Sequence, residues 1–194
     1  MVHKGLPVAQ FTCQQDWEAW LEQNQDRPGV WLKIAKKGSS EMSVTYDQAL
    51  EAALCFGWVD GQKAALDEHH WLQRFTPRSS RSRWSLINRR KAQELIDQGR
   101  MRPAGMNRIE QARADGRWQA AYEGQSAASV PQDLREELDR RPRAKEFFGT
   151  LDSANRYAIL YRLSEAKLPA TRARRLEKYL KMLEAGERIH ERAS

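Results

Sequence analysis

The chain has 194 residues, which is enough to bury one sizeable core and to carry a smaller helical extension. Hydrophobic residues make up 40% of it, charged residues make up 30%, and the formal net charge is +7; no apolar run reaches the ~18 residues that cross a membrane, so a membrane protein is not expected. Two cysteines, Cys13 and Cys55, exclude a disulfide framework, and the N-terminus shows no apolar secretory segment, so we expect a reducing, cytoplasmic location.

A capping motif precedes the first predicted helix. Thr12 and Gln15 have the Thr-x-x-Gln spacing of a capping box, which predicts a helix over residues 13–24. Apolar side chains recur along it at helical spacing and form one face, made of Trp17, Trp20 and Leu21. After a turn, residues 30–35 are rich in β-branched and aromatic side chains and predict a strand.

A second capping box, formed by Thr45 and Gln48, predicts a helix over residues 46–56. Gly57 follows it in the position where helices commonly end on a left-handed glycine. The preceding residues 43–45 are a candidate short strand.

Extended structure and two more helices are predicted next. Residues 58–78 look extended, and the Asp-Gly pair at 60–61 is typical of a tight turn between two strands. Ser82 can cap a helix over 83–98, and a proline in the first-turn position opens a further helix over 103–115. This part of the chain therefore predicts a small sheet followed by helices.

The composition changes near residue 124. Residues 124–131 are small, polar and uncharged, which is typical of a linker, and helical patterns then cover 131–140, 142–150, 153–166 and 169–185. The sequence therefore predicts an α+β fold, in which a small β-structure packs with helices and a helical C-terminal portion follows. The predicted boundaries are a core domain over 1–123, a linker over 124–131 and a helical region over 132–194.

Several short motifs lie between Ala52 and Gly116. They read Gly57-Trp58-Val59-Asp60-Gly61, Phe75-Thr76-Pro77-Arg78, Ser82-Arg83-Trp84-Ser85 with Asn88, and Gly99-Arg100-Met101-Arg102-Pro103-Ala104-Gly105. With Trp31-Leu32 upstream and Thr171-Arg172-x-Arg174-Arg175 in the last helix, they resemble the bacteriocin-protection, YdeI/OmpD-associated family over nearly the whole chain. The resemblance implies a part in tolerance of bacteriocins or cationic peptides and an association with a porin, and it implies no reaction. The expected cytoplasmic location argues against the porin association.

The positive charge is concentrated in one central block. Residues 71–118 carry 12 basic and 4 acidic side chains, and 11 of the 12 cations are arginine. Arginine presents a planar fork of N–H groups that pairs with two oxygens of a phosphate or carboxylate. The block therefore predicts either an anion site or a solvated arginine-rich face with internal ion pairs, and the sequence leaves both open.

The N-terminal end of the predicted 83–98 helix is the preferred ligand site. Arginines gather there, where the free N–H groups and the dipole of a helix favour anions. Ser85 and Asn88 fall in the apolar stripe of the helix, so they either tie down the 76–78 loop or face a cavity that holds a polar ligand. The residues expected to bind the ligand are Trp58, Asp60, Arg74, Thr76, Arg78, Arg83, Trp84, Ser85 and Asn88.

Three functions remain open. The first is a cytoplasmic protein that binds an anionic ligand at the 74–85 loop, in a setting of stress or antimicrobial-peptide tolerance. The second is an enzyme acting on a small phosphorylated or carboxylate metabolite, in a pocket lined by Trp58, Asp60, Arg78, Ser85 and Asn88. The third is a regulator that binds nucleic acid, with the bases of the nucleic acid stacked on Trp58, Trp71 and Trp84. The spacing of these tryptophans, however, favours core packing. Since the chain is cationic, direct capture of a cationic peptide is not expected.

Other candidate residues have structural alternatives that we favour. Cys55 lies in the last turn of its helix, where the dipole opposes a thiolate, so we expect a structural thiol. His69 and His70 beside Asp67 lack a second ligand cluster, so no metal site and no cofactor are expected. Asp60 and Asp67 could form an acid–base pair, but the turn at 60–61 is the preferred interpretation. The basic cluster near the C-terminus is expected to solvate its helix or to contact phosphate nonspecifically; it comprises Arg172, Arg174, Arg175, Lys178 and Lys181.

Overall fold

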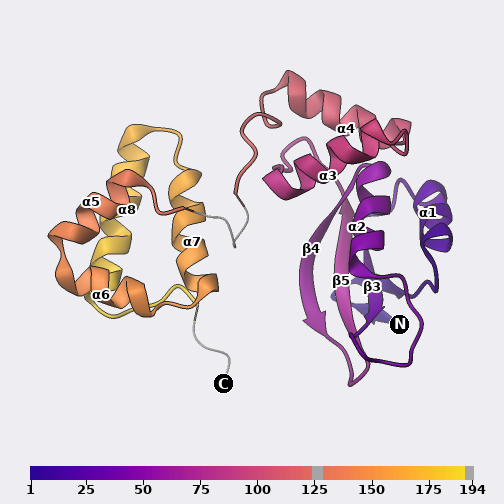
Figure 1. The fold of residues 1–194 in the computed structure, drawn as a ribbon, viewed down its shortest axis with the longest axis horizontal. Helices are drawn as coiled ribbons and strands as arrows, with labels where there is room; N and C mark the ends of the chain where they lie inside the picture. Colours follow the sequence, from indigo (N-terminus) through magenta and orange to yellow (C-terminus); the bar gives the residue numbers. More distant parts are fainter. Residues whose placement is uncertain (124–128, 191–194) are drawn as a thin grey trace. The chain divides into compact units, whose positions relative to one another are not determined.

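A computed structural model of the chain describes residues 1–123 and 129–190. It contains two units, Met1–Tyr122 and Glu123–Ser194 (Figure 1). The first unit holds all of the described β-structure and four helices, and the second holds helices, so the predicted α+β class with a helical C-terminal portion is confirmed. Most of the linker predicted over 124–131 lies outside the described residues.

The first unit is built on a five-stranded sheet in the order β1-β2-β3-β5-β4. The predicted strand over 30–35 is confirmed as β3, and the extended region over 58–78 as the antiparallel pair of β4 and β5. The sequence did not indicate β1 and β2, which are too short to show a period-2 pattern. The strands are β1 (Val2–His3), β2 (Leu6–Ala9), β3 (Val30–Ala35), β4 (Trp58–Ala65) and β5 (His70–Pro77). The candidate strand over 43–45 is wrong, because those residues form no strand and Val44 N–H donates to the carbonyl of Phe11.

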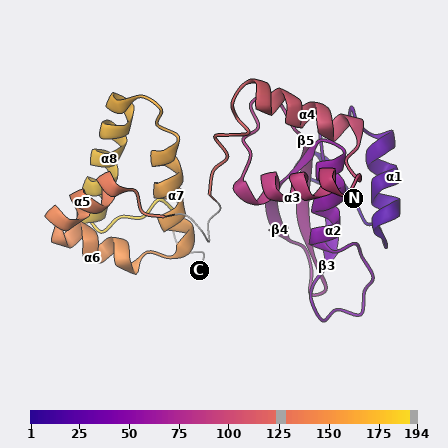
Figure 2. The ribbon, with the colours of Figure 1, turned by 45° about the horizontal axis from the view of Figure 1, so that its top comes forward.

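Four helices complete the first unit: α1 (Gln14–Gln23), α2 (Tyr46–Cys55), α3 (Leu86–Asp97) and α4 (Pro103–Ala114). Helices α1 and α2 cover one face of the sheet, and α3 and α4 lie beside α2 at one end of it, as Figures 1 and 2 show. Because side chains alternate along a strand, Phe75 points toward the helices, where its ring centroid lies 5.6 Å from that of Trp17. Arg74 and Thr76 therefore point to the opposite face.

One of the two capping boxes predicted from the sequence is present in the structure. Thr45 and Gln48 form the predicted capping box at the start of α2, and Gly57 ends the helix with a φ of +76°. The box predicted from Thr12 is wrong: Cys13 takes the N-cap position of α1, and the Thr12 hydroxyl bonds the carboxylate of Asp16 instead.

Helix α3 begins three residues later than predicted. Its N-cap is Ser85, whose hydroxyl accepts a hydrogen bond of 3.1 Å from the backbone N–H of Asn88. Ser82, the predicted cap, instead accepts from the backbone N–H of Ser79 and closes a turn before the helix. The backbone of Tyr122 pairs with the segment around Ser85 and sets where the helix starts.

The turn predicted at 60–61 is wrong. Both residues lie inside β4, where the pairing with β5 shifts register between Asp60 and Lys63. The hairpin turns instead at residues 66–69. There the Asp67 carboxylate accepts hydrogen bonds from the backbone N–H groups of His69 (2.9 Å) and His70 (2.7 Å).

Helices α2 and α4 approach each other closely at Gly105. A Cβ atom at this position would lie 2.3 Å from the carbonyl oxygen of Cys55 and 2.6 Å from that of Leu54. Only glycine allows this separation, because real Cβ atoms essentially never come closer than 3.0 Å.

The second unit packs α5 (Gln132–Arg140), α6 (Pro142–Thr150), α7 (Ser153–Ser164) and α8 (Pro169–Glu184) around its own core. The expectation that the basic cluster of α8 is simply solvated is wrong for two of its members. Arg172 forms a two-bond ion pair with Asp133 (2.6 and 2.7 Å), and Arg175 donates to the carbonyl of Arg162. None of the helices in the described residues is long and apolar enough to cross a membrane.

Candidate anion site before helix α3

Asp60 of β4 is the point where three elements of the first unit meet. Its Oδ1 accepts a hydrogen bond of 3.2 Å from the side-chain amide of Asn88 in α3, and its Oδ2 accepts one of 2.8 Å from the hydroxyl of Tyr46 in α2. Asn88 therefore ties α3 to β4 rather than to the 76–78 loop. Sequence reasoning missed Tyr46, which lies fourteen residues before its partner and belongs to no recognisable motif.

Both oxygens of Asp60 accept hydrogen bonds from the protein, so this carboxylate holds α2, α3 and β4 together and is not arranged as one half of an acid–base pair. Burial and the neighbouring charge of Asp60 raise the pKa of Tyr46, so the phenol stays protonated and donates at neutral pH. Asp60 and Asp67 do not form the acid–base pair considered as the less favoured alternative to a turn, because the two carboxylates lie at opposite ends of the β4–β5 hairpin.

Arg78, which follows β5, is the most unusual side chain of the site. It is 2% exposed, and its guanidinium carbon lies 3.5 Å from the ring centroid of Trp84. Its Nη1 donates to the carbonyl of Arg83 at 3.2 Å, and its backbone N–H donates to the carbonyl of Gly57 at 2.9 Å. Burial lowers the pKa of Arg78 to about 10, while the charge of Asp60 opposes this shift, so the group stays cationic at neutral pH.

One edge of the Arg78 guanidinium is left open. Its Nε and Nη2 have no hydrogen-bond acceptor among the residues that the structure describes. These two N–H groups are parallel and form the edge that grips a carboxylate side-on, as Arg172 shows with Asp133 in the second unit. The indole N–H groups of Trp58 and Trp84 are also buried without an acceptor in the described part of the chain.

The structure brings together only some of the residues that were predicted to bind the ligand. Asp60, Arg78, Trp84, Ser85 and Asn88 gather at the start of α3, and the guanidinium of Arg83 lies 5.0 Å from the ring of Tyr122. Arg74 and Thr76 are not part of this group, because they lie on the opposite face of the sheet, where Arg74 stands across from Trp31.

The tryptophans are mainly core residues. Trp58 is fully buried, and its ring centroid lies 5.8 Å from that of Trp20. Trp84 is 1% exposed and packs edge-on against Trp118, with ring centroids 4.8 Å apart. A stacking platform for nucleic-acid bases at Trp58 and Trp84 is therefore excluded, and the core interpretation is confirmed for both.

The remaining candidates have structural roles. Cys55 is 4% exposed, and burial raises the pKa of its thiol to about 11, so it is not a poised nucleophile. The His70 ring bonds the Asp67 carboxylate at 3.0 Å. Across residues 1–123 and 129–190, no three side chains of His, Cys, Asp or Glu gather in a way that could hold a metal ion.

Comparison with known families divides the chain near the same point as the structure. Residues 9–108 match a domain of unknown function (DUF8412), and residues 127–186 match the family described as Bacteriocin-protection, YdeI or OmpD-Associated. The resemblance to the latter is thus confirmed in the C-terminal unit, which includes the 171–175 motif. The motifs between Ala52 and Arg108 fall in the other match. No curated protein and no solved structure matches the chain.

Proposed function

The chain belongs to the DUF8412 domain family, matched over half of its length, and from this premise we propose that it binds a small oxyanion at Arg78. One observation carries the proposal: a cationic guanidinium that is 2% exposed leaves two parallel N–H groups without an acceptor in the described residues. A buried unsatisfied donor costs ~1–3 kcal/mol, and more when it is charged. A protein is expected to keep such unsatisfied N–H groups where a bound ligand supplies the missing hydrogen-bond acceptors.

The open edge of Arg78 defines the ligand class. Nε and Nη2 fit two oxygens of one carboxylate or one phosphate group, in the arrangement that Arg172 makes with Asp133. The face of the guanidinium is covered by Trp84 and its Nη1 is used by Arg83, so only this edge is free to bind. The ligand is therefore held by one end.

The loop before α3 controls access. Ser79, Ser80 and Arg81 are exposed, and two hydrogen bonds between Ser79 and Ser82, of 2.9 and 3.2 Å, hold the loop together. Arg117, in the segment after α4, holds this loop in place by donating a hydrogen bond of 2.8 Å to the carbonyl of Ser82. We propose that a ligand reaches Arg78 when this short segment moves, because its three side chains are polar and exposed.

We propose that this binding belongs to a setting of bacteriocin or antimicrobial-peptide tolerance, a proposal that the family match of residues 127–186 supports. We propose a cytoplasmic location, which the exposed free thiol of Cys13 supports because such a thiol persists in a reducing compartment. Direct neutralisation of a cationic peptide is disfavoured by the net charge of +7.

Thermal unfolding in sodium acetate and in sodium phosphate, compared with chloride at equal ionic strength, tests the proposal. All seven tryptophans lie in the first unit, so tryptophan fluorescence reports the unit that holds Arg78. We expect saturable stabilisation, which amounts to ~2.7 kcal/mol at a concentration of 100 times Kd. Arg78→Met should abolish this response, whereas Arg81→Met, at an exposed arginine of the same loop, should keep it.

The ligand-free stability of Arg78→Met separates binding from a purely structural role. Replacing an incompletely paired buried charge by an apolar side chain of similar volume is often neutral or stabilising, so the melting temperature should stay the same or rise. A clear decrease together with an unchanged response to acetate and phosphate would show that Arg78 only supports the fold. A wild-type protein that responds to neither anion would also overturn the proposal.

A further inference from the structure

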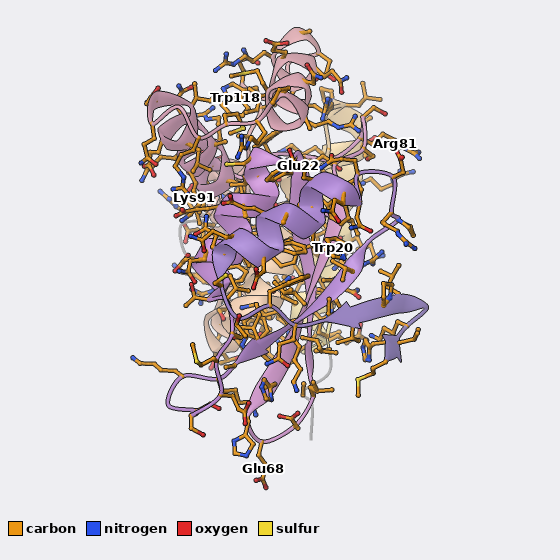
Figure 3. The ribbon with its side chains drawn as sticks, turned by 90° about the vertical axis from the view of Figure 1, so that its right-hand side faces the viewer. Trp20, Glu22, Glu68, Arg81, Lys91 and Trp118 are labelled. Atoms are coloured by element: carbon orange, nitrogen blue, oxygen red, sulfur yellow. The ribbon has the colours of Figure 1, made fainter. Side chains whose placement is uncertain are left out.

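Helix α3 and the segment after α4 line a cleft in the first unit. Its volume is about 440 Å³, within the ~300–1,000 Å³ range of small-molecule sites. The lining residues are Leu86, Arg89, Arg90, Gln93 and Trp118, and none of them belongs to the Arg78 site. In Figure 3, Trp118 lies at the end of the unit opposite to Glu68, which marks the β4–β5 turn.

Three arginines at this cleft are not neutralised by a carboxylate in the part of the chain that the structure describes. Arg89 donates to the backbone carbonyl of Trp118 at 3.1 Å, and Arg113 donates to the side-chain carbonyl of Gln93 at 3.1 Å. Arg90 is exposed and has no hydrogen-bond or ion-pair partner among the described residues. Two guanidinium groups are thus positioned by neutral acceptors, and the third is free to bind.

The neighbouring cations are paired, which makes the cleft distinct. Lys91, next to Arg90 in sequence, lies 3.2 Å from Glu51, and Arg100 lies 3.0 Å from the same carboxylate. Arg117 lies 2.7 Å from Asp115. The side chain of Gln93 also donates a hydrogen bond of 2.9 Å to the Asp97 carboxylate. The residues that line the cleft include Arg89 and Arg90 and no carboxylate, so the lining carries an excess of positive charge.

An apolar wall completes the cleft. Trp118 is 9% exposed and is held between the edge-on ring of Trp84 at 4.8 Å and the guanidinium of Arg113 at 5.2 Å. Leu86, in the first turn of α3, is half-buried beside it. An indole fixed in this way is a rigid surface, which lowers the entropy cost of binding an apolar group.

We infer that this cleft binds a phosphorylated small molecule that carries an apolar or aromatic group. The phosphate lies between Arg89 and Arg90, because arginine binds phosphate bidentately and these two line the cleft. The apolar group lies against Leu86 and the exposed edge of Trp118. The excess of cations favours the dianionic charge of a phosphate monoester over the single charge of a carboxylate.

Calorimetric titration with 1-naphthyl phosphate and with inorganic phosphate, at one salt concentration, tests this inference. We expect one naphthyl phosphate per chain, bound at least ~10-fold more tightly than inorganic phosphate, because its ring buries apolar surface that phosphate lacks. Arg90→Gln should weaken binding about 10-fold or more, the effect of losing a charge-assisted hydrogen bond. Arg27→Gln removes the same charge from an exposed residue after α1 and should leave the affinity unchanged.

Four outcomes would overturn the inference. The first is equal affinity for naphthyl phosphate and inorganic phosphate, and the second is an equal effect of Arg90→Gln and Arg27→Gln. The third is loss of binding in Arg78→Met with retention in Arg90→Gln, which would assign the ligand to the other site. The fourth outcome is that naphthyl phosphate does not bind, whereas a single-stranded oligonucleotide binds with a steep salt dependence. If Arg90→Gln then abolishes the binding of the oligonucleotide, the cleft binds a nucleic-acid polymer instead of a small molecule.

Discussion

Substitution of Gly105 by alanine tests the closest contact between two helices of the first unit. The added Cβ would lie 2.3 Å from the carbonyl oxygen of Cys55, which is 0.7 Å inside the 3.0 Å limit that real Cβ atoms keep. It would also lie 2.6 Å from the carbonyl oxygen of Leu54. Both oxygens belong to the backbone of α2 and cannot rotate away, so α4 has to move. Met101, whose sulfur is 2.6 Å away, can move its flexible side chain.

The size of the effect follows from these overlaps. Overpacking a well-packed contact costs ~1–3 kcal/mol, and rigid backbone atoms place Gly105→Ala near the upper end. Alanine recovers up to ~1 kcal/mol of helix propensity, so we expect a net loss of about 2 kcal/mol. An entropy of unfolding of ~2.1 cal/mol/K per residue over the 122 residues of the unit converts this loss to a decrease in melting temperature of about 8 °C.

Thermal unfolding followed by tryptophan fluorescence measures this decrease, because every tryptophan lies in the first unit. Gly61→Ala is the matched control, since a Cβ there meets nothing closer than 3.7 Å. Its melting temperature should stay within about 2 °C of the wild type, the usual range for a change without a clash. If Gly105→Ala also melted within 2 °C of the wild type, the close approach of α4 to α2 would not be a constraint on the fold.

Two further predictions follow from the surroundings of titratable groups. At pH 7.5, dithionitrobenzoate should titrate one thiol per native chain, Cys13, and a second only in denaturant, because burial raises the pKa of Cys55 to about 11; fast reaction of both would contradict this. Arg172 holds the pKa of Asp133 below its usual value, so this pair stabilises the second unit above about pH 4, and the contribution is lost as the pH falls through the lowered pKa. The stability difference between wild type and Asp133→Asn, measured in urea from the methyl NMR signals of Leu134, should therefore be largest at neutral pH and vanish in acid; a difference independent of pH would refute the assignment.

The sequence was most informative where one short segment determines the structure. The capping box of Thr45 and Gln48 and the terminal Gly57 lie within thirteen residues, and both ends of α2 were predicted to within one residue. The extended region predicted over 58–78 similarly contains β4 and β5.

Long-range contacts decided the features that the sequence did not predict. Both Ser82 and Ser85 are acceptable N-caps, and the backbone bonds from Tyr122 select Ser85. The Asp-Gly pair at 60–61 is a turn signal by itself, but bonds from Tyr46 and Asn88 hold Asp60 inside a strand. No local pattern encodes these partners.

The sequence predicted most of the residues of the candidate site, but it did not predict that Arg78 is buried. The arginines of the central block indicated either an anion site or a solvated arginine-rich face, and the sequence left both open. Arg78 is instead buried under Trp84, which in turn rests on Trp118, forty residues further along the chain than Arg78. Its open Nε and Nη2 edge could be recognised only once these neighbours were in place.

The ends of the sheet bear on how the protein behaves at high concentration. An edge strand offers unpaired backbone groups on which a strand of another molecule can add, and this is a route to aggregation. Here one edge is β1, with only two residues, and the other is β4, whose register shift between Asp60 and Lys63 breaks the regular spacing of those groups. Lys63 also adds a positive charge to this edge. Neither edge is a good template for a second chain, so the unit can carry an open sheet without polymerising through it.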